Sequence, residues 1–209
     1  VTSPFPSKLD QEKSNTDIYS VEQRIRAYLS RERYFRKRYK GYLDNIQRYK
    51  SGGKLLDVGC NIGLFLDVAR QHGFTVEGVE LNHACAAYGR ERFHLTIHDR
   101  PLENAAFPGG TFEVVTLFDV LEHIVDVPGF LGEVKRILKK DGLLVIQSPN
   151  LDSLMSRMAG SRWSWLTPPD HLYHFTVSTL EKFITNAEFT VRWKRTWEPL
   201  EDFLGNIIT

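Results

Sequence analysis

The sequence predicts an α/β fold in which a mostly parallel sheet carries helices on both faces. From Lys54 onward, short apolar segments with the character of strands alternate with segments of helical spacing, and this alternation is typical of a parallel sheet. The first apolar segment ends at a glycine turn that leads directly into a helix. The chain has 209 residues, 42% of them hydrophobic and 25% charged, which suits one globular domain with a sizeable core.

The elements after residue 54 follow from their patterns of apolar residues. Residues 54–58 and 142–147 are short apolar runs beside glycine, as in strands buried on both faces. Residues 189–197 alternate between apolar and polar side chains, which favours a strand. Residues 129–138 carry apolar side chains three and four positions apart, which favours a helix. The expected strands are 54–58, 75–79, 94–97, 112–117, 142–147 and 189–197, and the expected helices are 62–72, 83–92, 129–138 and 176–186.

The first 50 residues are expected to form a mobile N-terminus and a helical cap. Residues 1–16 are polar with two prolines, and residues 18–50 have helical character. The segment 31–40 is strongly basic with interleaved aromatic residues. We interpret it as a solvated helix face with aromatic anchors. The alternative is a cap over a ligand, which would bring Tyr34, Phe35 or Arg38 near that ligand.

Residues 149–175 form a long segment rich in proline, tryptophan and histidine after the fifth expected strand. Such an insertion is more often functional than decorative, and we expect it to act as a lid. The predicted organisation is therefore a cap within 1–50, a main domain at 51–198 that contains the insertion, and a short tail at 199–209. The chain opens at Val1 and not at methionine, so the natural start is left open.

The glycine turn is the most informative stretch. Gly59 and Gly63 allow the backbone to turn tightly and to approach a ligand closely. Asp57 precedes the turn, and a buried carboxylate there needs a partner, such as the cationic amine of a ligand. Glu80 follows the second strand, where an acceptor for a ribose diol is expected. A nucleoside joined to an amino acid satisfies both acids, and S-adenosylmethionine is such a molecule.

The order Asp57-x-Gly59-x-Asn61-x-Gly63, then Glu80, then residues 118–123 (Phe-Asp-Val-Leu-Glu-His), resembles the class I S-adenosylmethionine-dependent methyltransferases. The resemblance covers residues 30–195, and it is strongest to the small-molecule branch that includes the quinone-pathway O-methyltransferases. Asn61 stands where the family usually has glycine, and asparagine tolerates left-handed backbone angles better than most residues.

The resemblance implies a Rossmann-like fold, S-adenosyl-L-methionine as cofactor, and a seventh, antiparallel strand that these residues do not show clearly. It places the family's adenine-binding pair, an acidic and a small residue, on Pro101-Leu102. Neither can supply a carboxylate, so Leu102 is left with its backbone N–H, and Asp99 or Arg100 is the substitute. The implied cofactor-binding residues are Asp57, Gly59, Cys60, Asn61, Gly63, Glu80, Leu81, Leu102, Phe118 and Asp119.

Histidines are the candidates for chemistry on the acceptor. Methyl transfer to oxygen can require a base that takes a proton, and we assign His123 and His171 as the candidate catalytic residues. Asp119, Glu122 and His123, with His171 or His174, could instead hold a divalent metal ion. We expect no metal. The expected activity is methyl transfer to a small-molecule acceptor, with oxygen favoured over nitrogen or carbon as the acceptor atom.

Composition and motif spacing limit the other functions and locations that the chain could have. The net charge of +1 gives no reason to expect nucleic acid, and no apolar run is long enough for a membrane span. Cys60 and Cys85 resemble free thiols of a reducing compartment, so a cytoplasmic protein is expected. An NAD-dependent oxidoreductase would want glycines at positions 59, 61 and 64, and two of these are missing. A non-catalytic module that binds the same cofactor stays open, because the adenine loop is altered.

Overall fold

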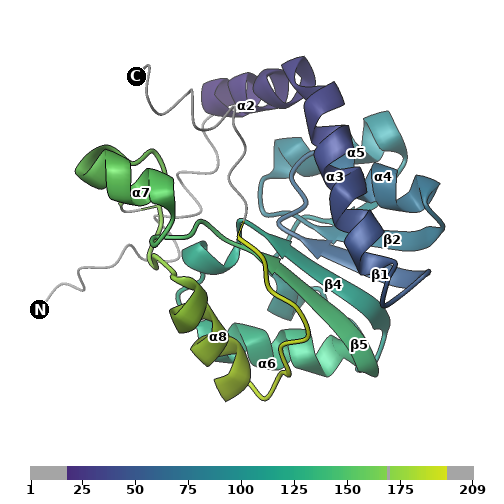
Figure 1. Ribbon diagram of the computed structural model, residues 1–209. Helices are drawn as coiled ribbons and strands as arrows, with labels where there is room; N and C mark the ends of the chain where they lie inside the picture. Colours follow the sequence, from purple (N-terminus) through teal and green to yellow (C-terminus); the bar gives the residue numbers. More distant parts are fainter. Residues whose placement is uncertain (1–17, 169, 197–209) are drawn as a thin grey trace, which may run out of the picture. The chain divides into compact units, whose positions relative to one another are not determined.

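The computed structural model describes residues 18–168 and 170–196 (Figure 1). The expectations for residues 1–16 and 199–209 lie outside these ranges. The chain folds as two compact units, one formed by residues 1–118 with 133–146 and the other by residues 119–132 with 147–209.

The first unit contains a five-stranded sheet with the order β3-β2-β1-β4-β5. The pairs β1–β2, β1–β4 and β2–β3 are parallel. The order reverses between β1 and β4, which makes their carboxyl ends the switch point where open α/β sheets bind ligands. The strands are β1 (Gly53–Val58), β2 (Phe74–Val79), β3 (Thr96–His98), β4 (Phe112–Phe118) and β5 (Leu138–Gln147).

Helices cover this sheet because both faces of its central strands are apolar. Leu55 and Val114, which pair across β1 and β4, belong to the core on the side of α3, α4 and α5. The next pair along the same strands, Leu56 and Val115, is also fully buried. The long apolar runs in the sequence therefore reflect burial on both faces. The helices that begin in this unit are α2 (Ile18–Ser30), α3 (Glu32–Ile46), α4 (Leu64–Gln71) and α5 (His83–Phe93), and η1 is Leu102–Asn104.

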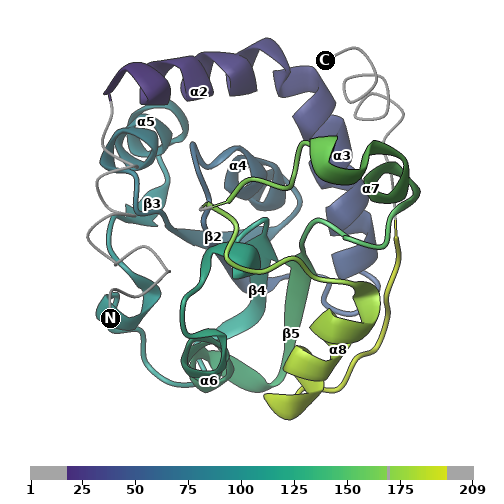
Figure 2. The same ribbon diagram turned by 90° about the vertical axis from the view of Figure 1, so that its left-hand side faces the viewer.

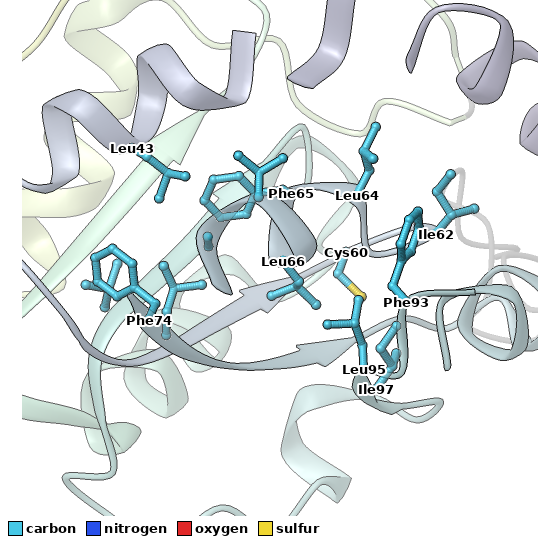
Figure 3. Packing of buried hydrophobic residues seen from close by; sticks show 14 of the residues in the cluster. Leu43, Cys60, Ile62, Leu64, Phe65, Leu66, Phe74, Phe93, Leu95 and Ile97 are labelled. Carbon is cyan, nitrogen blue, oxygen red and sulfur yellow. The ribbon is translucent and has the colours of Figure 1, made fainter. Parts of the chain in front are cut away.

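Figure 3 shows the core that joins the N-terminal helices to the sheet, with Leu43 pointing from α3 into the cluster. Leu43 and Ile46 are 0% and 2% exposed. The helices expected within residues 18–50 are therefore present, and the last turns of α3 form part of the main core. Asn82 begins α5 by accepting a hydrogen bond from the Cys85 N–H at 3.0 Å, as an N-cap residue does.

The second unit is built from short elements. These are η2 (Leu121–His123), the first turns of α6 (Val127–Ile137), α7 (Leu154–Ala159), η3 (Gly160–Arg162) and α8 (Val177–Asn186). The two ends of the 149–175 segment meet, because the Leu151 N–H donates to the Phe175 carbonyl at 2.8 Å and Asn150 forms a bridge with Phe175. Thr176 and Thr179 form a capping box at the start of α8.

The sixth expected strand was wrong over its described part, because residues 189–196 contain no strand. Their side chains are mostly exposed, and that of Trp193 is 52% exposed. Alternation shows only which side chains would face a sheet; a strand also needs a hydrogen-bonding partner. The seventh strand is likewise not found in residues 18–168 and 170–196. The other expected strands and helices are confirmed, with shifts of a few residues at their ends.

In the described ranges, no helix has both the length and the apolar character needed to cross a membrane.

Candidate active site

The glycine turn lies at the carboxyl end of β1 and needs left-handed backbone angles at three positions. Gly59, Asn61 and Gly63 have φ values of 75°, 51° and 76°. The Asn61 side chain supports its own strained position, because its Oδ1 accepts a hydrogen bond from the Ile62 N–H at 2.8 Å. This local bond is a physical reason why asparagine can stand where the family usually has glycine.

Glu80 ties the glycine turn to the end of β2. Its Oε2 accepts from the Asn61 N–H, and its Oε1 accepts from the Asn82 N–H, both at 2.8 Å. The carboxylate is only partly buried. It is thus held rigidly at the carboxyl edge of the sheet, where an acidic side chain suits the hydroxyls of a ribose.

Asp57 is almost fully buried, with 2% of its surface exposed. Its Oδ1 accepts a hydrogen bond from the Thr116 hydroxyl at 2.6 Å. Burial raises the pKa of Asp57 to about 7; the Thr116 bond opposes this rise and the negative charge of Glu80 adds to it. None of these contributions comes from a cationic side chain of the described residues, and a ligand with a cationic amine would provide positive charge beside Asp57.

Three further residues of the first unit that are candidates for cofactor binding, Cys60, Leu102 and Leu81, differ in the exposure of their side chains. The Cys60 side chain is 5% exposed, and burial raises the pKa of its thiol well above the ordinary range. Leu102 is also buried, so only the backbone of these two residues is suited to a ligand. Leu81 directly follows Glu80 and is 48% exposed. Its exposed apolar side chain suits the face of an adenine ring.

Asp99, the candidate substitute near the adenine loop, already has two partners. Its carboxylate interacts with Arg90 at 3.2 Å and with His83 Nδ1 at 3.1 Å. The hydrogen bonds from Arg90 and His83 lower the pKa of Asp99 to about 2. Asp99 is therefore a structural anchor between α5 and the end of β3, and a ligand would have to share it.

An aromatic group lies at the carboxyl end of β4. Phe118 packs against Phe65 with ring centroids 4.9 Å apart and against Tyr42 at 5.0 Å. Tyr39 packs against Phe65 at 5.5 Å. Sequence reasoning pointed to Tyr34, Phe35 or Arg38 as the cap residues near a ligand and did not single out Tyr39 and Tyr42. The spacing of the aromatic residues 35, 39 and 42 along one helix face was the available signal.

In the second unit, residues 119–123 are brought beside residues 171–173. The N–H groups of Leu172 and Tyr173 donate to the Glu122 carbonyl at 2.9 and 3.2 Å. As a result, the rings of His123 and His171 lie 4.8 Å apart at an interplanar angle of 79°. The two predicted catalytic histidines, which are 48 positions apart in the sequence, are therefore neighbours.

Both histidines have a backbone carbonyl at Nδ1. The His123 Nδ1 lies 2.7 Å from the Asp170 carbonyl oxygen, and the His171 Nδ1 lies 2.8 Å from that of Trp165. A carbonyl oxygen only accepts, so each Nδ1 carries a proton, and in the neutral form of either ring the lone pair is on Nε2. Burial lowers the pKa of His171, and the neighbouring His123 adds to this effect. Neutral His171 is thus suited to accept a proton.

Glu122 completes this group and is a buried residue, 1% exposed. Its Oε2 accepts from the Ser148 hydroxyl at 3.0 Å, whereas no partner among the described residues reaches its Oε1. Burial and the charge of Asp119 raise the pKa of Glu122 to about 7. Asp119 itself has φ 55° and accepts from the Gln147 amide at 3.0 and 3.2 Å.

Glu122, His123 and His171 also have the composition of a metal site. One ligand atom from each lies within 4.8 Å of the others, and two imidazoles with one carboxylate are a common donor set for divalent transition metals. Backbone carbonyls at both Nδ1 atoms are the usual outer contacts of metal-binding histidines. Asp119 and His174 are not part of this group. The residues present therefore fit a divalent ion.

Comparison with known proteins places the chain in a family. The family model described as "Methyltransferase domain" matches residues 32–193, so the chain belongs to that family. A ubiquinone biosynthesis O-methyltransferase from Bradyrhizobium sp. (strain ORS 278) is 32% identical over 149 residues, which cover 67% of this chain and 56% of the relative. The chain thus spans just over half the length of the curated relatives that it resembles.

Solved structures share the fold. A SAM-dependent methyltransferase from Archaeoglobus fulgidus has a TM-score of 0.63 at 22% identity, covering 78% of this chain and 74% of that one. Haemonchus contortus phosphoethanolamine N-methyltransferase 2, in complex with S-adenosyl-L-methionine, has a TM-score of 0.54 at 21% identity and covers 71% and 36%. The predicted family and the Rossmann-like α/β fold are confirmed.

Proposed function

We propose that the protein transfers a methyl group from S-adenosyl-L-methionine to an oxygen atom of a small-molecule acceptor. The observation that carries the proposal is the pair of acids at the carboxyl ends of the neighbouring strands β1 and β2. Asp57 is the second-last residue of β1 and Glu80 directly follows β2, and the glycine turn lies between them in the sequence. One ligand that carries both a cationic amine and a ribose diol matches the two acids.

In this proposal the first unit binds the cofactor and the second receives the acceptor. Asp57 and Glu80 hold the amine and the ribose, and the glycine turn lets the backbone approach the ligand. The activated methyl group belongs to the cofactor, so the protein mainly aligns donor and acceptor. The relatives named as O-methyltransferases support oxygen as the acceptor atom.

His171 is the proposed base, and His123 orients the acceptor beside it. Removal of the acceptor proton makes the oxygen a better nucleophile for the sulfonium methyl group. The Nδ1 bonds fix both rings so that each Nε2 faces away from its carbonyl partner. Trp165, which stacks on His171 with centroids 6.2 Å apart, is a wall suited to an aromatic acceptor.

A divalent ion is the second use for the same three side chains, and the buried Glu122 Oε1 favours it. Glu122, His123 and His171 would hold the ion, which would act as a Lewis acid on the acceptor oxygen. The experiment is metal analysis of the purified protein before and after chelation, with Zn²⁺ and Mn²⁺ titrated back. Metal binding by the wild type that is lost in Glu122→Gln supports a metal site. Equally weak metal binding in Glu122→Gln and in the wild type supports our expectation that the protein holds no metal.

The test of the function uses S-adenosylmethionine with a deuterated methyl group. The protein is incubated with a panel of catechols, other phenols and primary amines, and products are detected by mass spectrometry. We expect the label on phenolic oxygen, and we expect Asp57→Asn to lose it. Cofactor binding without transfer to any member would favour a non-catalytic binding module. Binding of NAD in place of the sulfur cofactor would favour an oxidoreductase.

The cellular setting follows from the same proposal. Cys60 and Cys85 are both free and buried, which suits a reducing compartment, so we place the protein in the cytoplasm. We propose no nucleic-acid partner, because the net charge is only +1 and two basic side chains of α3, Arg36 and Lys40, pair with Glu32 and Asp44 on the same helix.

A further inference from the structure

Asp67 is a buried acid of the first unit that the proposed chemistry does not use. It lies in the first turn of α4 and is 4% exposed. Its oxygens accept from Arg36 Nη1 at 2.9 Å, Arg70 Nη2 at 2.8 Å and the Gln71 amide at 2.9 Å. Arg70 and Gln71 belong to the same helix as Asp67, but Arg36 comes from α3. One buried carboxylate therefore joins the cap to the sheet layer.

Arg36 lies in the N-terminal half of α3, away from the buried C-terminal end of this helix. The buried apolar residues of α3, Leu43 and Ile46, are both in its last turns. The helix begins at Arg31 without a hydrogen bond from that side chain to the first turn. Arg36 also bonds to Glu32 at 2.7 Å, so the same guanidinium fixes the first turn and the neighbouring helix. Both views show α3 lying beside α4 (Figures 1 and 2).

The part of α3 just after Arg36 reaches the cofactor end of the sheet. Tyr39 packs on Phe65, and Tyr42 packs on Phe118 at the carboxyl end of β4. Burial raises the pKa of Tyr39 well above its ordinary value, and the neighbouring Tyr28 and the charge of Asp57 contribute. Tyr39 is thus within electrostatic reach of the acid assigned to the cofactor amine. A small rotation of α3 would move both tyrosines relative to Asp57.

We propose that Asp67 is a positioning residue for the cofactor site. Through Arg36 it fixes α3 so that Tyr39 and Tyr42 form one wall of the site at the carboxyl ends of β1 and β4. The inference rests on the proposed function, because it assumes that this site holds S-adenosylmethionine. It adds that the affinity for the cofactor depends on the Asp67–Arg36 ion pair, although this ion pair does not contact the cofactor.

The competing explanation is that Asp67 only stabilises the fold. Removing one partner of a buried ion pair destabilises a protein whatever else it does. The two explanations differ in cofactor affinity, measured under conditions where every variant is folded. They differ further in coupling: a positioning residue that acts through Tyr39 has no effect left once the Tyr39 side chain is removed.

The experiment compares the Kd for S-adenosylmethionine in the wild type, Asp67→Asn, Tyr39→Leu and the double variant, with thermal midpoints recorded in parallel. The matched control is Asp44→Asn. Asp44 pairs with Lys40 on the same helix at 2.9 Å, but both side chains are more than half exposed and neither joins α3 to another element. We expect Asp67→Asn to weaken binding on the order of three- to thirtyfold, the range seen for coupling through packed networks. Asp44→Asn should leave the Kd within twofold.

In the double variant, we expect the Kd to equal that of Tyr39→Leu within twofold. Additive losses, or an unchanged Kd in a folded Asp67→Asn protein with a lowered thermal midpoint, would overturn the inference and leave Asp67 as an anchor only. If the wild type binds no S-adenosylmethionine, the proposed function fails and this inference fails with it. Wild-type binding with unaffected variants overturns the positioning role alone.

Discussion

The glycine turn of the first unit and the histidine cluster of the second are built in different ways. The turn is made mostly of backbone: three left-handed residues, and a Glu80 carboxylate that accepts two backbone N–H groups. The cluster is made of side chains that the 149–175 segment brings to η2. A site made from consecutive backbone groups tolerates few sequences, whereas a cluster of distant side chains is free to vary. The first should therefore set the cofactor and the second the acceptor chemistry.

The largest expected effect is on the rate of transfer when the cluster loses its base. His171→Ala should lower kcat on the order of 10²- to 10⁴-fold, the usual contribution of general base catalysis, because the variant lacks the proposed base. The measurement is the initial rate with the best acceptor from the labelled panel. His174→Ala, which removes an imidazole that the proposal does not use, is the control, and an equal loss in both variants would argue against a specific base.

The second effect concerns the buried acid of the turn and appears as a pH dependence of stability. The folded-state pKa of Asp57 is about 7, above the ordinary value of 3.8, so between these values the folded protein holds a proton that the unfolded chain releases. The free energy of unfolding should therefore fall as pH rises from about 4 to about 7, by up to about 4 kcal/mol from this group.

Urea denaturation of the protein without cofactor, repeated across this pH range, measures the slope. Asp57→Asn should flatten it, while the smaller slope from Glu122, whose pKa is also raised, should remain. An equally steep slope in Asp57→Asn would show that Asp57 is already ionised in the folded protein, and the electrostatic part of the account would be wrong.

The smallest effect is on the turn's backbone. A Cβ at Gly63 would lie 2.5 Å from Leu95 Cδ1 and 3.3 Å from Ile97 Cδ1, at φ 76°. We expect Gly63→Ala to cost about 1–3 kcal/mol of unfolding free energy for the strained backbone, and more for the clash. Gly73→Ala is the control, because φ there is 92° and nothing lies within 4 Å of the added Cβ. Equal losses of unfolding free energy at the two positions would mean that the Leu95 side chain moves aside without an energetic cost.

The difference between the backbone-built glycine turn and the side-chain-built histidine cluster also explains which features could be predicted from the sequence. Asp57, the glycines and Glu80 are local signals next to strand ends, so their placement follows once the strands are recognised. The proximity of His123 to His171 depends on hydrogen bonds from Leu172 and Tyr173 to Glu122, and no local pattern records such contacts. Asp67 was missed for a related reason, because its partner Arg36 is 31 positions away. The expected strand at 189–197 failed because alternation carries no information about pairing.

The most direct test compares cofactor affinity in two variants, one from each unit. Isothermal titration with S-adenosylmethionine should show that Glu80→Gln binds about 10- to 100-fold more weakly than the wild type, since hydrogen bonds to a charged group are lost. The control is Glu77→Gln, which alters an acid within β2 that pairs with His98, and this variant should bind normally. His171→Ala should also keep the wild-type Kd. Unchanged binding in Glu80→Gln together with weakened binding in His171→Ala would contradict the assignment of the cofactor to the glycine turn.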